Sequence, residues 1–293
     1  MGTFIQLFVD GLSTGAIYAA LGLAIVLVNQ STGMVNFAQG GMAVLSAYFV
    51  YAFVGMGMPL IVGIILAVIA AFILGALLEL TLIRRFEKGD PDTAIVVTVG
   101  LLTLITGICG WIWSYNNLRL PWLFPESSFS FLGATISWRS LGTFLVILVV
   151  MGLIQLLFRG TRLGLALRAV ADNPASAALS GIPVGRHLMI GWGLAAALGA
   201  IAGALVAPRL SLTPGMFDTV LVYALAAVIL GGLTSPFGVV VAALLIGVLE
   251  NLAAVYLPFV GHDLKIAVPF VLLFIVLLVR PQGLFGKKTV VRV

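Results

Sequence analysis

The chain alternates long hydrophobic stretches with short polar interruptions, and this pattern predicts helices that cross a membrane. Asp, Glu, Lys and Arg are absent from residues 11–78, 93–118, 140–158 and 219–249. A helix needs roughly 20 apolar residues to cross the ~30 Å hydrocarbon core of a bilayer. We therefore expect an all-α, polytopic transmembrane bundle of about nine segments, in a range of eight to ten. The expected segments lie near residues 4–28, 34–53, 60–78, 93–113, 141–158, 188–208, 220–233, 237–257 and 265–279.

The basic residues are divided unevenly between the two sides that these alternating segments define. One side would hold eleven of the fifteen Lys and Arg residues: Arg84, Arg85, Lys88, Arg159, Arg162, Arg168, Arg186, Arg280, Lys287, Lys288 and Arg292. Cytoplasmic loops of membrane proteins carry such an excess of positive charge. We therefore expect one membrane domain over residues 1–293, with an external N-terminus and a cytoplasmic C-terminus.

Small residues at helical spacing indicate where helices approach closely. Gly11 and Gly15 are four residues apart in the first segment, and Gly199 and Gly203 repeat the spacing in the sixth. Such pairs permit close contact between helix backbones in a membrane.

A weak internal similarity links the third and eighth segments. Gly75-Ala76-Leu77 resembles Gly247-Val248-Leu249, and each is followed by an acidic residue, Glu79 or Glu250. The two segments run in opposite directions, as an inverted repeat requires; chance similarity between helices rich in Leu, Gly and Ala is the alternative. We expect Glu79 to lie at the membrane interface near Arg84.

A basic, mostly polar loop at residues 159–187 interrupts the hydrophobic pattern and contains its own helix signals. Asn173 is a suitable N-cap, and Pro174 fits the first helical position, where a missing N–H is harmless. Gly181 suits the C-terminal end of the helix, and Pro183 prevents its continuation. These signals predict a helix at residues 174–180 that docks another protein, with an ordinary basic loop as the alternative.

Composition supports the membrane assignment and excludes several other functions. The 293 residues are 62% hydrophobic and 9% charged, whereas soluble domains carry about 25% charged residues. The net charge of +5 resides in clusters at segment ends, so we expect no nucleic-acid partner. The lone Cys109, the separated His187 and His262, and a tail in which Lys288 replaces the Ser or Thr of a phosphate-binding loop predict no catalytic, cofactor or metal site.

Polar side chains inside the hydrophobic pattern are candidates for a solute pathway. Asn29, Asn36 and Gln39 surround a break between two segments, and Glu250 and Asn251 lie within the eighth segment. Buried polar groups in a membrane need partners or a water-filled cavity. Contacts that hold helices together are the alternative role for these side chains.

Three motifs resemble one family of membrane proteins over nearly the whole chain. They are Ser31–Gly40 (STGMVNFAQG), Leu167–Ile182 (LRAVADNP through GI) and Arg280–Gly286 (RPQGLFG). These motifs are similar to the LivH-like permease subunits of branched-chain amino acid ABC importers. Members of that family often have His and Glu where this chain has Gln39 and Gly41, which leaves the identity of the solute open.

The resemblance implies a subunit of an ATP-driven import complex in a bacterial or archaeal cytoplasmic (inner) membrane, and not an enzyme. The implied partners are a second homologous permease, two cytoplasmic ATPase subunits that would bind ATP and magnesium, and an extracytoplasmic substrate-binding protein. The solute would be small and neutral or zwitterionic, with branched-chain or other hydrophobic amino acids first and urea or short amides also open. A stand-alone secondary transporter or channel for a small polar solute is the alternative. The residues implied in ATPase coupling are Arg168, Asp172, Asn173, Pro174, Ala175, Ala177, Ala178 and Gly181.

Overall fold

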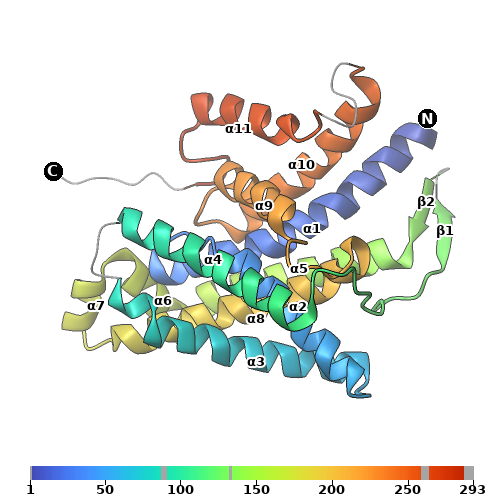
Figure 1. Cartoon of the computed structure of the whole chain (residues 1–293). Coiled ribbons are helices and arrows are strands. Elements are labelled where there is room, and N and C mark those ends of the chain that lie inside the picture. The colour runs from blue at the N-terminus through green and yellow to red at the C-terminus, as the bar shows by residue number, and fades with distance from the viewer. Residues whose placement is uncertain (1, 87–90, 132–133, 259–263, 287–293) are drawn as a thin grey trace. The chain divides into compact units, whose positions relative to one another are not determined.

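The computed structural model describes residues 2–86, 91–131, 134–258 and 264–286, and its nine apolar helices correspond to the nine predicted segments (Figure 1). Six of them are long and apolar enough to cross a membrane, whereas α2, α9 and α11 are shorter. The expectation of an all-α, polytopic bundle is thereby confirmed. The helices are α1 (Gly2–Thr32), α2 (Gln39–Gly55), α3 (Leu60–Thr81), the 3-10 helix η1 (Ile83–Arg85), α4 (Pro91–Trp113), α5 (Trp138–Gly160), α6 (Arg162–Asp172), α7 (Pro174–Leu179), α8 (Val184–Leu210), α9 (Asp218–Gly231), α10 (Pro236–Tyr256) and α11 (Ala267–Val279).

The chain divides into two compact units, each built from segments that are distant in the sequence. The first unit comprises Met1–Val26, Phe124–Gly152 and Val222–Val293, and the second comprises Leu27–Leu123 and Leu153–Leu221. Helices α1, α5 and α9 therefore contribute residues to both units. The single domain expected over the whole chain stays a prediction.

In the first unit, α1 packs closely against α10 through the predicted glycine pair. A Cβ atom on Gly11 would lie 2.5 Å from the Cα atom of Val248, and one on Gly15 would lie 2.6 Å from the Cα atom of Leu244. Any larger residue at either position would have to push the two backbones apart. The close helix contact predicted from the Gly11–Gly15 spacing is confirmed.

A β-hairpin in the first unit lies between α4 and α5. Strands β1 (Ser128–Phe131) and β2 (Ala134–Ser137) pair antiparallel. The Thr135 amide donates to the side-chain oxygen of Gln6 at 2.7 Å, which fastens the hairpin to α1. The hairpin was not predicted, although the Ser-Phe-Ser-Phe alternation of β1 has the period of two that is typical of a strand.

The described C-terminal segment of the first unit packs on the turn between α9 and α10. The Leu284 amide donates to the carbonyl of Leu230 at 2.8 Å, and the Phe285 amide donates to that of Gly231 at 3.2 Å. The Phe285 ring meets Phe237 edge to face, with ring centroids 5.5 Å apart. The RPQGLFG motif thus supplies two backbone donors and one aromatic ring to this turn.

In the second unit, α8 packs along both α2 and α3, again through glycines. A Cβ atom on Gly75 of α3 would lie 2.6 Å from the carbonyl oxygen of Trp192, and one on Gly203 of α8 would lie 2.5 Å from that of Ala43. These contacts bring backbones together where larger side chains would separate them. The three helices form the core of this unit.

The break between α1 and α2 starts later than expected. Helix α1 continues to Thr32 because the Ser31 and Thr32 hydroxyls donate to carbonyls one turn earlier, each at 2.8 Å. Gly33, with φ of 75°, ends the helix, and α2 begins at Gln39 where the pattern predicted Met34. The expected start of the second segment was wrong because residues 34–38, apolar except for Asn36, form a non-helical connection in which the Asn36 side chain accepts from the Ala38 amide at 2.9 Å.

Candidate functional site

Helix α7 forms where the sequence predicted the docking helix, and its N-terminal end has the expected cap. The Asn173 side-chain oxygen accepts from the Ser176 amide at 2.9 Å. Asn173 has extended backbone angles, and Pro174 occupies the first helical position. Both features satisfy the free backbone groups at the start of the helix, so the predicted N-cap is confirmed.

The C-terminal end of α7 is closed by two backbone hydrogen bonds, donated by the residues that follow the helix. The Gly181 amide donates to the carbonyl of Ala178, and the Ile182 amide donates to that of Ala177, both at 3.0 Å. Gly181 has φ of 80°. This arrangement is the Schellman motif, which explains why glycine is required there.

The two faces of α7 have different environments. Ala177 is 4% exposed and packs with Val170 and Leu188 in a small apolar cluster. Ala178 is exposed on the outward side, and Leu179 is 91% exposed. Ala177 therefore attaches the helix to the second unit, and Ala178 and Leu179 are available to a partner.

Helix α6 lies immediately before α7 and was missed in the sequence. Its N-cap is Thr161, whose hydroxyl accepts from the Gly164 amide at 3.0 Å. Leu167 is fully buried. The remaining residues predicted for ATPase coupling are all exposed: Arg168, Asp172, Asn173, Pro174, Ala175, Ala178 and Gly181.

Two of the predicted pathway residues meet in the second unit, at the start of α2. Asn36 and Gln39 are fully buried, and the Asn36 side-chain nitrogen lies 3.5 Å from the side-chain oxygen of Gln39. The Asn36 oxygen accepts from the Ala38 amide at 2.9 Å, and the Gln39 nitrogen donates to the carbonyl of Ala195 at 2.9 Å. These bonds join the break to α8. Asn29 is half-buried in α1, before the break.

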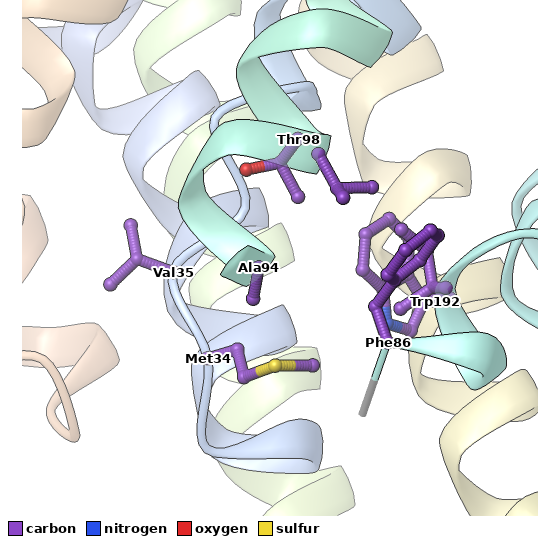
Figure 2. Close-up of a pocket in the computed structure, with 8 residues that line it drawn as sticks. Met34, Val35, Phe86, Ala94, Thr98 and Trp192 are labelled. Atoms are coloured by element: carbon purple, nitrogen blue, oxygen red, sulfur yellow. The ribbon is translucent and has the colours of Figure 1, made fainter. Parts of the chain in front are cut away.

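A small apolar pocket of the second unit lies beside the same break (Figure 2). It is lined by Met34, Val35, Ile83, Phe86, Ala94, Val97, Thr98 and Trp192. The indole N–H of Trp192 is buried and has no hydrogen-bond partner among the described residues. The pocket therefore combines apolar walls with one free donor.

Glu250, the predicted pathway residue of the first unit, has a complete set of partners. It is 1% exposed and accepts hydrogen bonds from Tyr18 at 2.9 Å and Tyr223 at 3.4 Å. Lys265 lies 3.4 Å away. The rings of Tyr18 and Tyr223 are stacked, with centroids 4.6 Å apart. Asn251 is only half-buried.

These partners could not have been found from the spacing of residues along the chain. Tyr18 is 232 positions from Glu250 and Tyr223 is 27 positions away. The two tyrosines occur in ordinary apolar contexts, so the sequence carries no local signal for the cluster. The structure shows that the cluster surrounds one carboxylate with two hydroxyl donors and one cation.

Residues 7–277 match the protein family described as the branched-chain amino acid transport system permease component. The chain belongs to this permease family. Its six long apolar helices and the family assignment together make it a multi-pass inner-membrane protein.

Curated relatives in the permease family match along almost their entire length. The branched-chain amino acid permease protein BraD of Pseudomonas aeruginosa is 28% identical, over 99% of this chain and 98% of the relative. LivH of Salmonella typhimurium is also 28% identical, with the same coverage. A probable LivH of Methanocaldococcus jannaschii is 28% identical over 91% of this chain and 87% of the relative.

Among solved structures, the chain is similar to PsaBC from Streptococcus pneumoniae in complex with Fab. The similarity covers 94% of this chain and 91% of that chain, with 16% sequence identity and a TM-score of 0.45. This TM-score is too low to establish a shared fold. Membership of the permease family rests on the sequence.

Proposed function

We propose that the chain is the membrane permease subunit of an ATP-binding cassette importer for a small neutral or zwitterionic solute. The observation that carries the proposal is α7. This helix is capped at both ends and exposes an apolar side chain, Leu179, at its C-terminal end, in a chain that belongs to the permease family. A helix of 6 residues is unstable alone in water. Its caps and the packing of Ala177 stabilise it, so that it can stay helical when a partner subunit pushes on it.

The partners of this importer follow from the same proposal. Two cytoplasmic ATPase subunits would bind ATP and magnesium, and one of them would seat α7 through Ala178 and Leu179. A second homologous permease would complete the membrane part, and an extracytoplasmic binding protein would deliver the solute.

Branched-chain amino acids are the first choice for the solute. The curated relatives carry this substrate in their names. The two acidic side chains that are buried in the described part of the chain both have cationic partners, so neither offers a free charge to a charged solute. Urea and short amides are the other solutes to test.

Uptake by the reconstituted complex tests the function. The permease would be placed in liposomes with its operon-encoded partners and offered labelled leucine, valine, urea and acetamide, with and without internal ATP. We expect leucine or valine uptake that requires both ATP and the binding protein. Flux through this chain alone, indifferent to ATP, would instead identify a channel or secondary transporter.

Docking through α7 has its own test. Replacing Leu179 with Arg places a charge at the contact and should lower recovery of the ATPase subunits in a detergent pull-down by at least about tenfold, because an unpaired charge in an interface costs several kcal/mol. Ala178→Arg should act in the same way. Leu179→Met, which preserves the apolar contact, is the matched control. Full recovery of both ATPase subunits with Leu179→Arg would refute docking at this position.

A further inference from the structure

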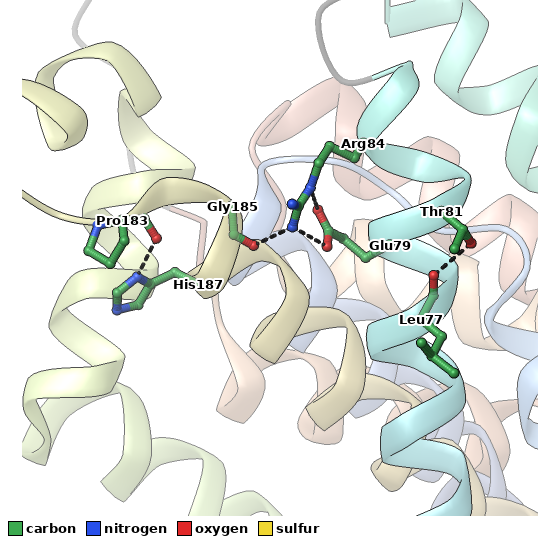
Figure 3. A network of polar contacts seen from close by, with 7 residues as sticks. All are labelled: Leu77, Glu79, Thr81, Arg84, Pro183, Gly185 and His187. Atoms are coloured by element: carbon green, nitrogen blue, oxygen red, sulfur yellow. Dashed lines mark hydrogen bonds and ion pairs between the residues drawn. The ribbon is translucent and has the colours of Figure 1, made fainter.

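Glu79 lies in the last turn of α3 and is fully buried. A negative charge at the C-terminal end of a helix is unfavourable, because the helix dipole is negative there. Arg84 compensates it with two parallel bonds: Nε donates to Oε1 at 3.0 Å and Nη2 donates to Oε2 at 2.8 Å (Figure 3). The predicted proximity of Glu79 to Arg84 is confirmed, and the structure shows in addition that Glu79 is buried in the protein. Its position at the membrane interface stays a prediction.

Arg84 also reaches the first turn of α8. Its Nη2 atom donates to the carbonyl oxygen of Gly185 at 2.8 Å. A Cβ atom on Gly185 would lie 3.2 Å from the Cζ atom of Arg84, so the absence of a side chain leaves room for the flat guanidinium. Glu79, Arg84 and Gly185 thus form one connected group, which we call the Glu79–Arg84–Gly185 link.

This link starts a few residues after the docking helix. Only Ser180 to Val184 separate Leu179 from Gly185. That connection is fixed by the Schellman bonds, by the rigid ring of Pro183, and by the contact of Ile182 and Val184 with the cluster around Ala177 and Leu188. When α7 moves, Gly185 should therefore move by nearly the same distance.

We propose that Arg84 is a positioning residue for energy coupling: it transmits movement of α7 from Gly185 to the C-terminal turn of α3, through the buried Glu79. Without Arg84, α7 could act on the membrane helices only through the chain segments that adjoin α7 and through the packing of their side chains. With it, α3 is held to the α7–α8 connection by directed, charge-assisted hydrogen bonds, which are stronger than neutral ones. The inference rests on the proposed importer function.

The test uses the whole importer in liposomes and measures solute imported per ATP hydrolysed. The main variant is Glu79→Gln combined with Arg84→Gln, which removes the link without leaving a buried charge unpaired. Arg85→Gln is the matched control, because Arg85 is the next residue of η1 and is exposed. Pull-down of the ATPase subunits with each variant verifies assembly.

We expect the double variant to assemble and hydrolyse ATP while its transport ratio falls at least about fivefold, the lower end of typical coupling between sites. The Arg85→Gln ratio should stay near that of the wild type. A purely structural ion pair would lower the yield of complex but leave the ratio of the assembled fraction unchanged. A wild-type ratio in the assembled double variant would overturn the inference.

A second variant keeps the inference testable if the double variant does not assemble. Arg84→Lys retains the charge but cannot contact Glu79 bidentately and Gly185 at once. Its transport ratio should fall between those of the wild type and an uncoupled importer, and an unchanged ratio would contradict the inference. If the wild-type complex shows no ATP-dependent uptake, the proposed importer function itself is refuted. If the wild type transports and only the variants differ in their transport ratio, the result concerns the Glu79–Arg84–Gly185 link alone.

Discussion

Among the residues that the structure describes, each unit buries one acidic side chain, and the two units neutralise it in different ways. Glu79 of the second unit is held by one guanidinium from a residue five positions later, with both oxygens engaged at 3.0 Å or less. Glu250 of the first unit is shared between two tyrosine hydroxyls and Lys265, whose nitrogen is 3.4 Å away. The first arrangement concentrates the compensation in one cation, and the second distributes it over three elements.

This difference indicates how well each buried carboxylate tolerates the loss of its basic partner. Burial makes an unpaired carboxylate expensive, and a guanidinium that makes both contacts cannot be replaced by a neutral donor. At Glu250, the two hydroxyl donors remain when the cation is removed. We therefore expect the second unit to be more sensitive than the first to loss of the basic partner.

Replacing Arg84 alone should have the largest effect. Arg84→Gln leaves the Glu79 carboxylate buried without a counter-charge, and removing one partner of a buried pair costs about 3–5 kcal/mol. The free energy of unfolding of the purified permease in detergent measures this loss. Arg85→Gln should stay within about 0.5 kcal/mol of the wild type, as ordinary surface substitutions do. Equal losses in the two variants would show that the buried pair has no special weight.

Removing the carboxylate of the first unit should have an intermediate effect. Glu250→Leu removes the acceptor that Tyr18 and Tyr223 share and leaves the buried Tyr223 hydroxyl without its carboxylate. The loss of the acceptor of one buried donor costs about 1–3 kcal/mol. Glu250→Gln keeps an acceptor oxygen and should cost less in the same unfolding measurement. Uptake by membranes containing equal amounts of each variant separates the pathway role, since a solute contact would reduce transport beyond the loss of folded protein. Unchanged uptake would assign Glu250 to structure alone.

Removing the basic partner of Glu250 should have the smallest effect. The two cations are similarly exposed, 44% for Lys265 and 38% for Arg84, but Lys265 lies 3.4 Å from its carboxylate where Arg84 lies 2.8 Å from its own. Tyr18 and Tyr223 still donate to Glu250 when Lys265 is removed. Lys265→Gln should therefore lower the free energy of unfolding by about 1 kcal/mol, the net contribution of one hydrogen-bonding contact. A loss as large as that of Arg84→Gln would erase the distinction between the two sites.

Local patterns in the sequence predicted those features whose cause is also local. The caps of α7 follow from Asn173, Pro174 and Gly181, which satisfy backbone groups within one or two turns. The α1–α10 contact follows from the Gly11–Gly15 spacing, although the sequence could not name the partner helix. The nine apolar segments follow from the length that a bilayer demands.

Features that depend on distant residues were not predictable in this way. Helix α6 is an exception, because its Thr161 cap and the helical spacing of the buried Gly164, Leu167 and Val170 are local signals that the prediction did not use. The outward position of Leu179 and the inward position of Ala177 depend on where α8 lies. The tyrosines around Glu250 come from helices whose order in space the sequence does not reveal.

The glycine contact between α1 and α10 also has a consequence for the order of biosynthesis. Val248 is made 237 residues after Gly11, the residue that it meets in the folded first unit. At roughly 5–20 residues per second, α1 waits on the order of 10–50 seconds for this partner. During that time the face of α1 that carries Gly11 and Gly15 must be covered by lipid, by the insertion machinery or by other helices. Assembly of the first unit is therefore a late event, completed only after the last quarter of the chain has entered the membrane.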